Sequence, residues 1–260
     1  MSQHSLNAFR LDGSVALVTG GGSGIGKETC IAMAQAGATV RVIDRDGAAA
    51  DAVAAEIAGQ GGRACADAAD VSDEAAVENL FANVASEAGG IDILVNNAGM
   101  AIRKPSVELP RDDWEKVMAV NMTGVFLCSR IAARHMIARG KGGAIVNTAS
   151  IMGLSGGGLY PNISYQTSKG AVVNMTRALA VEWAPHGIRV NAVAPTYVTT
   201  PFIAPLLAQP ELVARIKAMT PLGRLAEPHE VALAILFLAS PAAAMITGHT
   251  LAVDGGFLAQ

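Results

Sequence analysis

Short runs of apolar residues alternate along the chain with longer segments in which apolar positions recur at helical spacing. The runs at 15–19, 39–44, 91–96, 143–148 and 188–194 are rich in β-branched residues, mostly lack polar alternation and are bounded by Gly, Pro or Asn, as is typical of buried strands. Residues 63–68 are a weaker strand candidate, and residues 249–253 fit a last strand. The segments 24–36, 48–59, 74–88, 111–139, 164–184 and 228–238 have the pattern of helices.

This alternation predicts parallel strands joined by right-handed crossovers, and therefore an α/β fold with a Rossmann-type, doubly wound parallel sheet flanked by helices. No linker, shift of composition or internal repeat divides the 260 residues, so we expect a single domain over 1–260. Residues 195–221 fit the alternation poorly, because they carry four prolines before Glu211. They follow the carboxyl end of a strand, where open α/β sheets bind ligands, so we expect a substrate lid there.

Composition narrows the classes of function. The chain is 51% hydrophobic and only 4% aromatic, which predicts a large aliphatic core. A net charge of −3 without a basic stripe argues against a nucleic-acid partner. Three scattered cysteines without a CxxC pair indicate free thiols in a reducing, cytoplasmic environment. The first residues lack a signal-type apolar stretch, and runs such as 231–239 are far shorter than the ~20 residues of a membrane helix. The five histidines show no metal-binding spacing, so we expect no metal.

A glycine-rich turn, VTGGGSGIG at 18–26, follows the first predicted strand and opens the first helix. Gly20 permits the tight turn, Gly24 lets the backbone approach a pyrophosphate, and Gly26 allows close packing of the helix on the strand. The N-terminus of the helix offers free N–H groups and its dipole to the phosphates. A glycine-rich turn alone is a weak signal, but this spacing between a strand and a helix predicts a dinucleotide site.

The second predicted strand ends in Asp44, 18 positions after Gly26. A carboxylate there can accept both hydroxyls of the adenosine ribose and would repel a 2′-phosphate, so it selects NAD over NADP. Arg45 could instead bind a phosphate. The neutral Ser23 before Gly24 favours NAD, which we expect as the cofactor.

Further motifs follow in order: Asp70-Val71, NNAG at 96–99, Asn121, Ser150, YQTSK at 165–169 and VDGG at 253–256. From about Leu11 onward the chain thereby resembles the short-chain dehydrogenase/reductase family, and its SGGGLYPNISYQTSK segment resembles the NAD-dependent polyol and sugar members. The resemblance implies that Asp70 and the Val71 backbone hold the adenine, that 97–99 line the ribose side, and that Val198 and Thr200 contact the nicotinamide amide and phosphate region. The predicted cofactor-binding residues are Gly20, Ser23, Gly24, Ile25, Gly26, Asp44, Arg45, Asp70, Val71, Asn97, Ala98, Gly99, Tyr165, Lys169, Pro195, Val198 and Thr200.

Tyr165 and Lys169 are four positions apart on a predicted helix and therefore face the same side. A phenol has a reference pKa of about 10. A neighbouring ammonium and a positive nicotinamide ring would lower the pKa of Tyr165 to near 7, a change of about 4 kcal/mol. Tyr165 could then take the hydroxyl proton of the substrate as hydride leaves carbon, and return it during reduction. Such a pair is common on ordinary helices, and the surrounding motifs are what favour catalysis.

Ser150 follows a predicted strand and can hydrogen-bond the reacting oxygen. The family resemblance implies that Asn121 holds a water that relays protons to the lysine. Two features depart from the family pattern. Ser150 lies 15 positions before Tyr165, about two more than usual, with the added residues expected in 156–158 and with Ser155 as the alternative serine. Thr196 stands where the family usually has glycine.

The sequence thus predicts an oxidoreductase that transfers hydride between NAD(H) and a secondary alcohol or ketone. Asn162 and Tyr160, on the loop before Tyr165, favour a small polyol or sugar-like substrate. Apolar candidates suit a cyclic or bulky ketone, and a 3-oxoacyl thioester is a third alternative, although no basic cluster is present for an acidic carrier. A non-catalytic scaffold is disfavoured because the Tyr-Lys pair is intact, and an epimerase would need a further C-terminal lobe. The pocket candidates are Ile102, Met152, Leu154, Leu159, Tyr160, Asn162, Tyr197 and Phe202.

Helices 111–139 and 164–184 carry more apolar surface than one side of a sheet requires. The family resemblance implies that they pair across a two-fold axis into a four-helix bundle, and that the tail 257–260 meets a second interface. We therefore expect a homotetramer.

Overall fold

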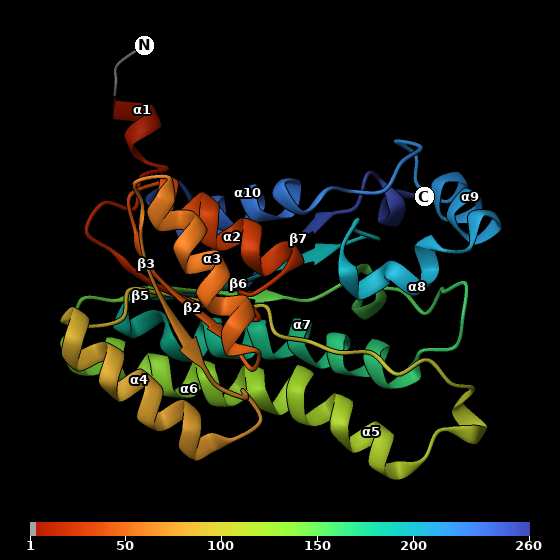
Figure 1. Cartoon of the computed structure of the whole chain (residues 1–260), viewed down its shortest axis with the longest axis horizontal. Helices are drawn as coiled ribbons and strands as arrows, with labels where there is room; N and C mark the ends of the chain where they lie inside the picture. The colour runs from red at the N-terminus through yellow and green to blue at the C-terminus, as the bar shows by residue number, and fades with distance from the viewer. Residues whose placement is uncertain (1–3) are drawn as a thin grey trace.

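The computed structural model describes residues 4–260 and builds them around one seven-stranded parallel sheet with the order β3-β2-β1-β4-β5-β6-β7 (Figure 1). The chain winds outward from the centre twice, first through β1, β2 and β3 and then through β4 to β7. This confirms the predicted doubly wound fold and places its switch point between β1 and β4. The strands are β1 Val15–Thr19, β2 Thr39–Asp44, β3 Arg63–Ala68, β4 Ile93–Asn96, β5 Gly143–Thr148, β6 Ile188–Pro195 and β7 Thr250–Val253.

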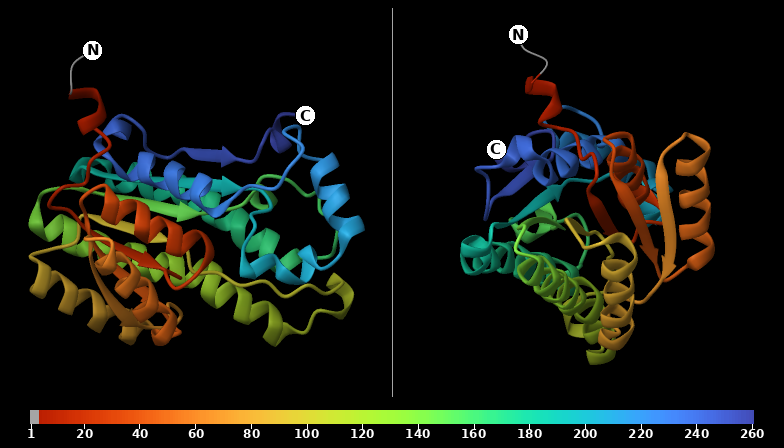
Figure 2. Two further views of the ribbon diagram at one scale, coloured as in Figure 1. Left: turned by 45° about the horizontal axis from the view of Figure 1, so that its top comes forward. Right: turned by 90° about the vertical axis from the view of Figure 1, so that its left-hand side faces the viewer.

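Helices cover both faces of the sheet, with α2, α3 and α10 on one side and α4, α6 and α7 on the other (Figures 1 and 2). The α-helices are α1 His4–Asn7, α2 Gly24–Gln35, α3 Gly47–Gly59, α4 Glu74–Ala88, α5 Arg111–Met118, α6 Val125–Arg139, α7 Ile163–Trp183, α8 Ala204–Leu207, α9 Pro210–Ala218 and α10 Pro228–Ala239. Short 3-10 turns occupy Ser106–Glu108, Ile151–Gly153, Ala184–His186, Pro201–Ile203, Pro241–Ala243 and Phe257–Ala259.

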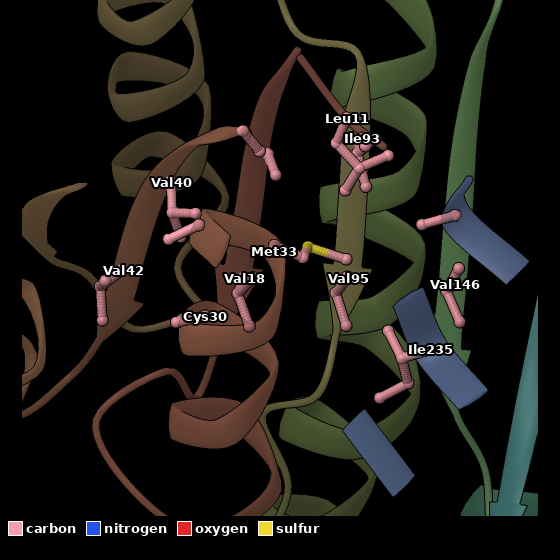
Figure 3. Close-up of a cluster of buried hydrophobic side chains, with 14 of the residues drawn as sticks. Leu11, Val18, Cys30, Met33, Val40, Val42, Ile93, Val95, Val146 and Ile235 are labelled. Carbon is pink, nitrogen blue, oxygen red and sulfur yellow. The ribbon is translucent and has the colours of Figure 1, made fainter. Parts of the chain in front are cut away.

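The continuous apolar runs of the strands follow from this three-layer arrangement, because successive side chains point to opposite faces and both faces are covered. In β1, Ala16 and Val18 pack into the cluster under α2, α3 and α10, whereas Val15 and Leu17 pack against α4, α6 and α7. Figure 3 shows the first cluster, where Val18 and its neighbours meet Met33 of α2. The core is aliphatic, as the composition predicted.

Local caps shift several predicted boundaries by one or two residues. The third helix begins at Gly47 because the Asp46 side chain accepts a hydrogen bond from Ala49 N at 3.2 Å. β4 begins at Ile93 rather than at residue 91, since the Asp92 carboxylate accepts from Val15 N at 2.8 Å just before the strand.

The predicted helix 111–139 is interrupted by a π-helical segment, Ala119–Gly124, between α5 and α6. The wider turn coincides with Asn121, whose amide bonds the loop after β4. A Cβ on Gly124 would lie 2.8 Å from a Val71 methyl, so the helix also passes very close to the loop after β3. The span Arg111–Arg139 is long and apolar enough to cross a membrane by length and composition alone, but 56% of its most apolar window is buried in this fold.

The proline-rich segment after β6 forms a compact cap beyond the carboxyl ends of β6 and β7 (Figure 1). It contains α8, α9 and a 3-10 turn, short elements that the strand–helix alternation did not predict. Ile203, Leu206 and Ile216 pack with Ile151 and Met152 into a separate apolar cluster. The segment therefore has its own small core, which borders the loop between β5 and α7.

Candidate active site

The glycine-rich turn joins β1 to α2 by a backbone path that side chains would block. Gly20 and Gly24 have φ values of 63° and 52°, in the left-handed region that favours glycine. A Cβ on Gly26 would lie 1.9 Å from Gly20 O, and one on Gly20 would lie 2.8 Å from Ala98 Cα. The turn therefore packs against the loop after β4 and leaves the N-terminus of α2 open, which is the cradle that a dinucleotide pyrophosphate needs.

Asp44 ends β2 beside this turn, and the backbone holds its carboxylate. Oδ2 accepts a hydrogen bond from Gly22 N at 3.0 Å, and Oδ1 accepts one from Asp46 N at 3.1 Å. The neighbouring Arg45 is exposed and forms no ion pair with any residue from 4 to 260. Its charge contributes to holding the pKa of Asp70 below its usual range, after the larger effect of the hydrogen bonds from Ser72. Arg45 thus acts electrostatically on Asp70.

The loops after β1 and β4 are tied together by one hydroxyl. Thr19 Oγ1 accepts from Asn97 N at 3.1 Å and Ala98 N at 3.2 Å, and lies 3.4 Å from Val95 O, to which it donates. Asn97 Nδ2 also donates to Gly20 O at 3.1 Å. The polar groups on this side are therefore satisfied by the protein itself, which holds the loops at a fixed spacing.

A cavity of about 360 Å³ runs along the carboxyl ends of the strands and joins the predicted cofactor and catalytic residues. Gly26 and Asn121 do not line it: Gly26 packs inside the turn, and Asn121 is buried behind the wall. The predicted residues that line the cavity are Gly20, Ser23, Gly24, Ile25, Asp44, Arg45, Asp70, Val71, Asn97, Ala98, Gly99, Ser150, Tyr165, Lys169, Pro195, Val198 and Thr200.

Tyr165 and Lys169 project from the first turns of α7, as their spacing predicted, and Lys169 Nζ lies 5.6 Å from the centre of the Tyr165 ring. The predicted lowering of the tyrosine pKa is not what the protein's own groups produce. Burial raises the pKa of Tyr165 to about 12, and a side-chain hydrogen bond with Ser150 is the larger of the opposing effects. A net lowering therefore has to come from a positive charge that the ligands bring.

Lys169 is only 3% exposed, and Nζ donates to Thr148 O at 2.5 Å. Burial lowers the pKa of its ammonium to about 8, because desolvation disfavours the charged form. The lysine is thus close to its titration range at physiological pH, rather than a permanently charged neighbour of the phenol.

Asn121 is fully buried in the π-helical segment, and both ends of its amide are used. Oδ1 accepts from Met100 N at 2.8 Å, while Nδ2 donates to Met100 O at 2.9 Å and to Ser168 Oγ at 3.1 Å. A Cβ on Gly99 would lie 3.5 Å from Asn121 Oδ1 and 3.7 Å from Lys169 Nζ, so the amide and the ammonium approach the same glycine. Asn121 holds the loop after β4 against α7, and its water-relay role stays a prediction.

Of the two candidate serines, Ser150 is the one that lines the cavity with Tyr165. It follows β5, is 6% exposed and opposes the rise of the Tyr165 pKa. Its Oγ also accepts from Met152 N at 3.1 Å. Ser155, the alternative, does not line the cavity, and its Oγ accepts from Gly157 N at 3.0 Å. The longer loop therefore leaves Ser150 in place.

The substrate end of the cavity contains polar atoms for which residues 4–260 offer no hydrogen-bond partner. They are Asn162 Oδ1, Thr196 Oγ1, the Tyr197 hydroxyl and Arg103 Nε. Asn162 and Tyr197 were predicted pocket residues, as were Met152, Tyr160 and Phe202, which also line the cavity. Ile102, Leu154 and Leu159 do not line it, so those three predictions were wrong. Leu154 is 40% exposed, and Leu159 packs against the cluster under the cap.

Arg103 is the charged residue of the pocket that sequence reasoning missed. It lies on the loop after β4, with its guanidinium carbon 5.3 Å from the centre of the Tyr160 ring and 5.7 Å from that of Phe202. The available signal was the Arg103-Lys104 pair, which directly follows the apolar run 100–102 past the carboxyl end of a strand.

Three comparisons place this geometry among known proteins. Galactitol 2-dehydrogenase (L-tagatose-forming) of Cereibacter sphaeroides is 49% identical over 251 residues, which are 96% of this chain and 96% of that protein. Cis-4-hydroxycyclohexanecarboxylate dehydrogenase of Sinomonas cyclohexanicum is 48% identical, covering 94% of this chain and 96% of its own. The crystal structure of a gluconate 5-dehydrogenase from Burkholderia cenocepacia in complex with NADP and tartrate matches with a TM-score of 0.94 at 37% identity, covering 99% of this chain and 100% of that one.

A family model described as Enoyl-(Acyl carrier protein) reductase matches residues 20–258. It spans the glycine-rich turn, the Tyr-Lys pair and the cap, which are the parts that build the cavity. The chain therefore belongs to the short-chain dehydrogenase/reductase family, and it is an oxidoreductase that acts on CH–OH groups with a nicotinamide cofactor.

Proposed function

We propose that this protein is an NAD-dependent dehydrogenase that oxidises a secondary hydroxyl of a small polyol or sugar-like substrate. The observation that carries the proposal is the set of unpaired polar atoms at the substrate end, from Asn162, Thr196 and Tyr197. Buried polar atoms are costly unless they are hydrogen-bonded. Hydroxyl groups on the carbons beside the reacting one can both donate and accept, so a polyol satisfies all three. The galactitol dehydrogenase similarity supports the same class of substrate.

The chemistry is centred on the Tyr165 hydroxyl. Ser150 lines the same cavity as Tyr165 and can orient the substrate oxygen beside that hydroxyl. A bound nicotinamide would supply the hydride chemistry, and the positive charge of its oxidised ring would favour the phenolate form of Tyr165. Tyr165 then accepts the hydroxyl proton, and Lys169 lies where a proton leaving the tyrosine can be stabilised or passed on.

NAD is proposed over NADP because of the fixed carboxylate of Asp44. Two backbone N–H groups hold it beside the glycine-rich turn, so it cannot easily turn away from a 2′-phosphate. Arg45 is exposed next to it, and the gluconate 5-dehydrogenase structure shows that a similar protein binds NADP. Cofactor preference therefore needs a direct kinetic measurement.

A cyclic secondary alcohol is the second candidate substrate. Met152, Phe202 and Ile203 give the cavity an apolar side, and the cyclohexanecarboxylate dehydrogenase is almost as similar to this chain as the galactitol enzyme. The oxidation of polyols, sugars, sterols and cyclic alcohols, followed by NADH absorbance, separates the two. The polyol proposal fails if hydrophobic cyclic alcohols are turned over with a kcat/KM about a hundredfold above every polyol tested.

We also propose that the cap after β6 is a lid over the substrate, and that the protein is a cytoplasmic homotetramer. The cap contributes Tyr197, Phe202 and Ile203 to the cavity wall, so its movement would open the substrate end. All three cysteines are unpaired, which suits a reducing compartment. The outer faces of α6 and α7 expose Ile137, Ile163 and Val181, the last at 79%. Light scattering at micromolar concentration tests the assembly, and a monomer mass would refute it.

A further inference from the structure

We propose that Arg103 binds a carboxylate of the substrate, so that the preferred substrate is a polyhydroxy acid rather than a neutral polyol. The inference rests on the proposed oxidation of a small polyhydroxylated compound and specifies one of its end groups. It assigns to Arg103 the choice between charged and neutral substrates.

The first observation is the position of Arg103 in the wall of the cavity. Its guanidinium lies over the Tyr160 ring at 5.3 Å and over the Phe202 ring at 5.7 Å. The Phe202 ring in turn lies 5.9 Å from the Tyr165 ring, centre to centre. Flat aromatic neighbours hold an arginine by cation–π attraction without occupying its hydrogen-bond donors. Arg103 is therefore fixed one aromatic ring away from the catalytic tyrosine with its donors free.

The second observation is that Arg103 lacks a partner of opposite charge. Among residues 4–260 it forms neither an ion pair nor a hydrogen bond, and its Nε is buried. By contrast, the partly buried Arg41 is paired with Asp67 at 2.7 Å, and Arg189 donates to three backbone carbonyls at the end of α10. A buried N–H donor without a partner, such as Nε of Arg103, is costly. A ligand that supplies an anion would remove this cost.

The third observation is the distribution of charge along the cavity. The only carboxylates in its lining are Asp44 and Asp70, both on the adenine side. The substrate end carries the cations Arg103 and Lys169 and no carboxylate. The charge of Arg103 also tends to lower the pKa of Tyr165 and of Tyr197, although burial outweighs it in both. An anionic group bound to Arg103 would therefore meet positive charge and no repelling carboxylate at the substrate end.

A carboxylate fits this site better than a phosphate ester. The planar fork of an arginine matches the two oxygens of a carboxylate. One guanidinium balances the single charge of a carboxylate, whereas a phosphate monoester carries about −1.5 to −2. Lys169 cannot supply the second cation, because its Nζ donates to Thr148 O beside the Tyr165 ring. The unpaired atoms of Asn162, Thr196 and Tyr197 remain available for the hydroxyls between the carboxylate and the reacting carbon.

The test compares substrates that differ only in the end group, with wild type and Arg103→Gln. D-gluconate and sorbitol form a six-carbon pair, and 4-hydroxycyclohexanecarboxylate and cyclohexanol form a cyclic pair. We expect the wild type to prefer the acid of the pair it oxidises by at least about tenfold in kcat/KM. Arg103→Gln should lower kcat/KM for the acid by about 100-fold, mainly through KM, because the contact is made to a non-reacting group. For the neutral alcohol, kcat/KM of Arg103→Gln should stay within about threefold of the wild-type value.

Two control variants separate recognition from a loss of pocket structure. Arg103→Lys keeps the charge and should recover part of the acid activity. Lys104→Gln removes the neighbouring cation, which is paired with Asp113 at 2.7 Å and does not line the cavity. This variant should leave kcat/KM unchanged for both the acid and the alcohol. A thermal-shift measurement with D-gluconate in the presence of NADH, which cannot oxidise it, gives a readout independent of turnover. We expect the acid to raise the Tm of the wild type but not that of Arg103→Gln.

Each other outcome contradicts a different statement. Equal losses for acid and alcohol in Arg103→Gln would mean that Arg103 only maintains the pocket. A tenfold preference for sorbitol 6-phosphate over D-gluconate would overturn the choice of carboxylate. If only the cyclic pair is oxidised, the polyol function fails, and the acid preference within that pair still decides the role of Arg103.

Discussion

The two ends of the cavity differ in how their polar groups are satisfied. At the cofactor end, the Asp44 carboxylate, the Thr19 hydroxyl and the Asn97 amide all bond backbone groups of the protein. At the substrate end, Arg103, Asn162 and Tyr197 have buried polar atoms that residues 4–260 leave unpaired. The cofactor end is thus complete before any ligand binds, whereas the substrate end needs the ligand to complete its hydrogen bonds. The first arrangement favours a preformed cofactor site, and the second favours discrimination between substrates.

The largest effect is expected where the two ends meet, at Tyr165. Tyr165→Phe should lower kcat by about 1,000-fold or more, because it removes the group that moves the proton. The dissociation constant for NAD should stay within a few-fold, since the cofactor end is built without this hydroxyl. Steady-state kinetics and fluorescence titration measure the two quantities. Tyr160→Phe is the matched control and should lower kcat by less than tenfold. If Tyr165→Phe kept a tenth of the wild-type turnover, the acid/base role would belong to another residue.

The preformed cofactor end is tested at Asp44. We expect the wild type to prefer NAD over NADP by at least tenfold in kcat/KM, which corresponds to about 1.4 kcal/mol. Asp44→Ala should abolish or reverse this preference, because it removes the charge that repels the 2′-phosphate. Arg45→Ala should retain the NAD preference. Equal use of both cofactors by the wild type would show that Arg45 dominates this position.

Lys169 provides a test of burial through the pH dependence of stability. The pKa of Lys169 in the folded protein is about 8, below the ordinary 10.5. Between these pH values the unfolded chain binds more protons at this lysine than the folded protein does, so the contribution of Lys169 to stability rises with pH. Lys169→Met removes this dependence. The free energy of unfolding of the wild type relative to the variant should therefore increase by about 2 kcal/mol from pH 7.5 to pH 10. Urea unfolding at both pH values measures this change, with a substitution of the exposed Lys141, Lys141→Met, as the control. If the difference in free energy of unfolding between wild type and Lys169→Met were the same at both pH values, Lys169 would not be desolvated.

The smallest effect compares one hydroxyl from each end. Thr19→Val leaves the N–H groups of Asn97 and Ala98 without their acceptor and should lower the free energy of unfolding by about 1–3 kcal/mol. Tyr197→Phe removes a hydroxyl that has no partner and should change stability by less than about 0.5 kcal/mol. The same Tyr197→Phe change should lower kcat/KM for the preferred substrate several-fold. Similar destabilisation by both substitutions would remove the difference between the two ends.

The doubly wound sheet and most of the cofactor end were predictable from the sequence, because their signals lie within short contiguous stretches. β1, the glycine-rich turn and α2 are continuous in the chain, and the left-handed backbone of Gly20 and Gly24 is a property of glycine itself. Tyr165 and Lys169 share a face for an equally local reason, since they are one helical turn apart.

Three features depended on packing between distant parts of the chain. The π-helical segment accompanies the bonds of Asn121 to Met100 and Ser168, which no periodicity within 111–139 reveals. The raised pKa of Tyr165 and the lowered pKa of Lys169 arise from burial, which is known only once the layers have formed.

The sequence by itself therefore determined the fold, the glycine-rich turn and the shared face of Tyr165 and Lys169, since each follows from backbone conformation and helical spacing among neighbouring residues. The tertiary structure alone decided the substrate end, because Arg103, Tyr160 and Phe202 come from three separate segments, two loops and the 3-10 turn Pro201–Ile203. Their contact, and the absence of any partner for the Arg103 guanidinium among residues 4–260, depend on how those segments pack over the carboxyl ends of the strands. Local patterns specify what each segment forms, and only the packed protein shows which charges are left for a ligand to neutralise.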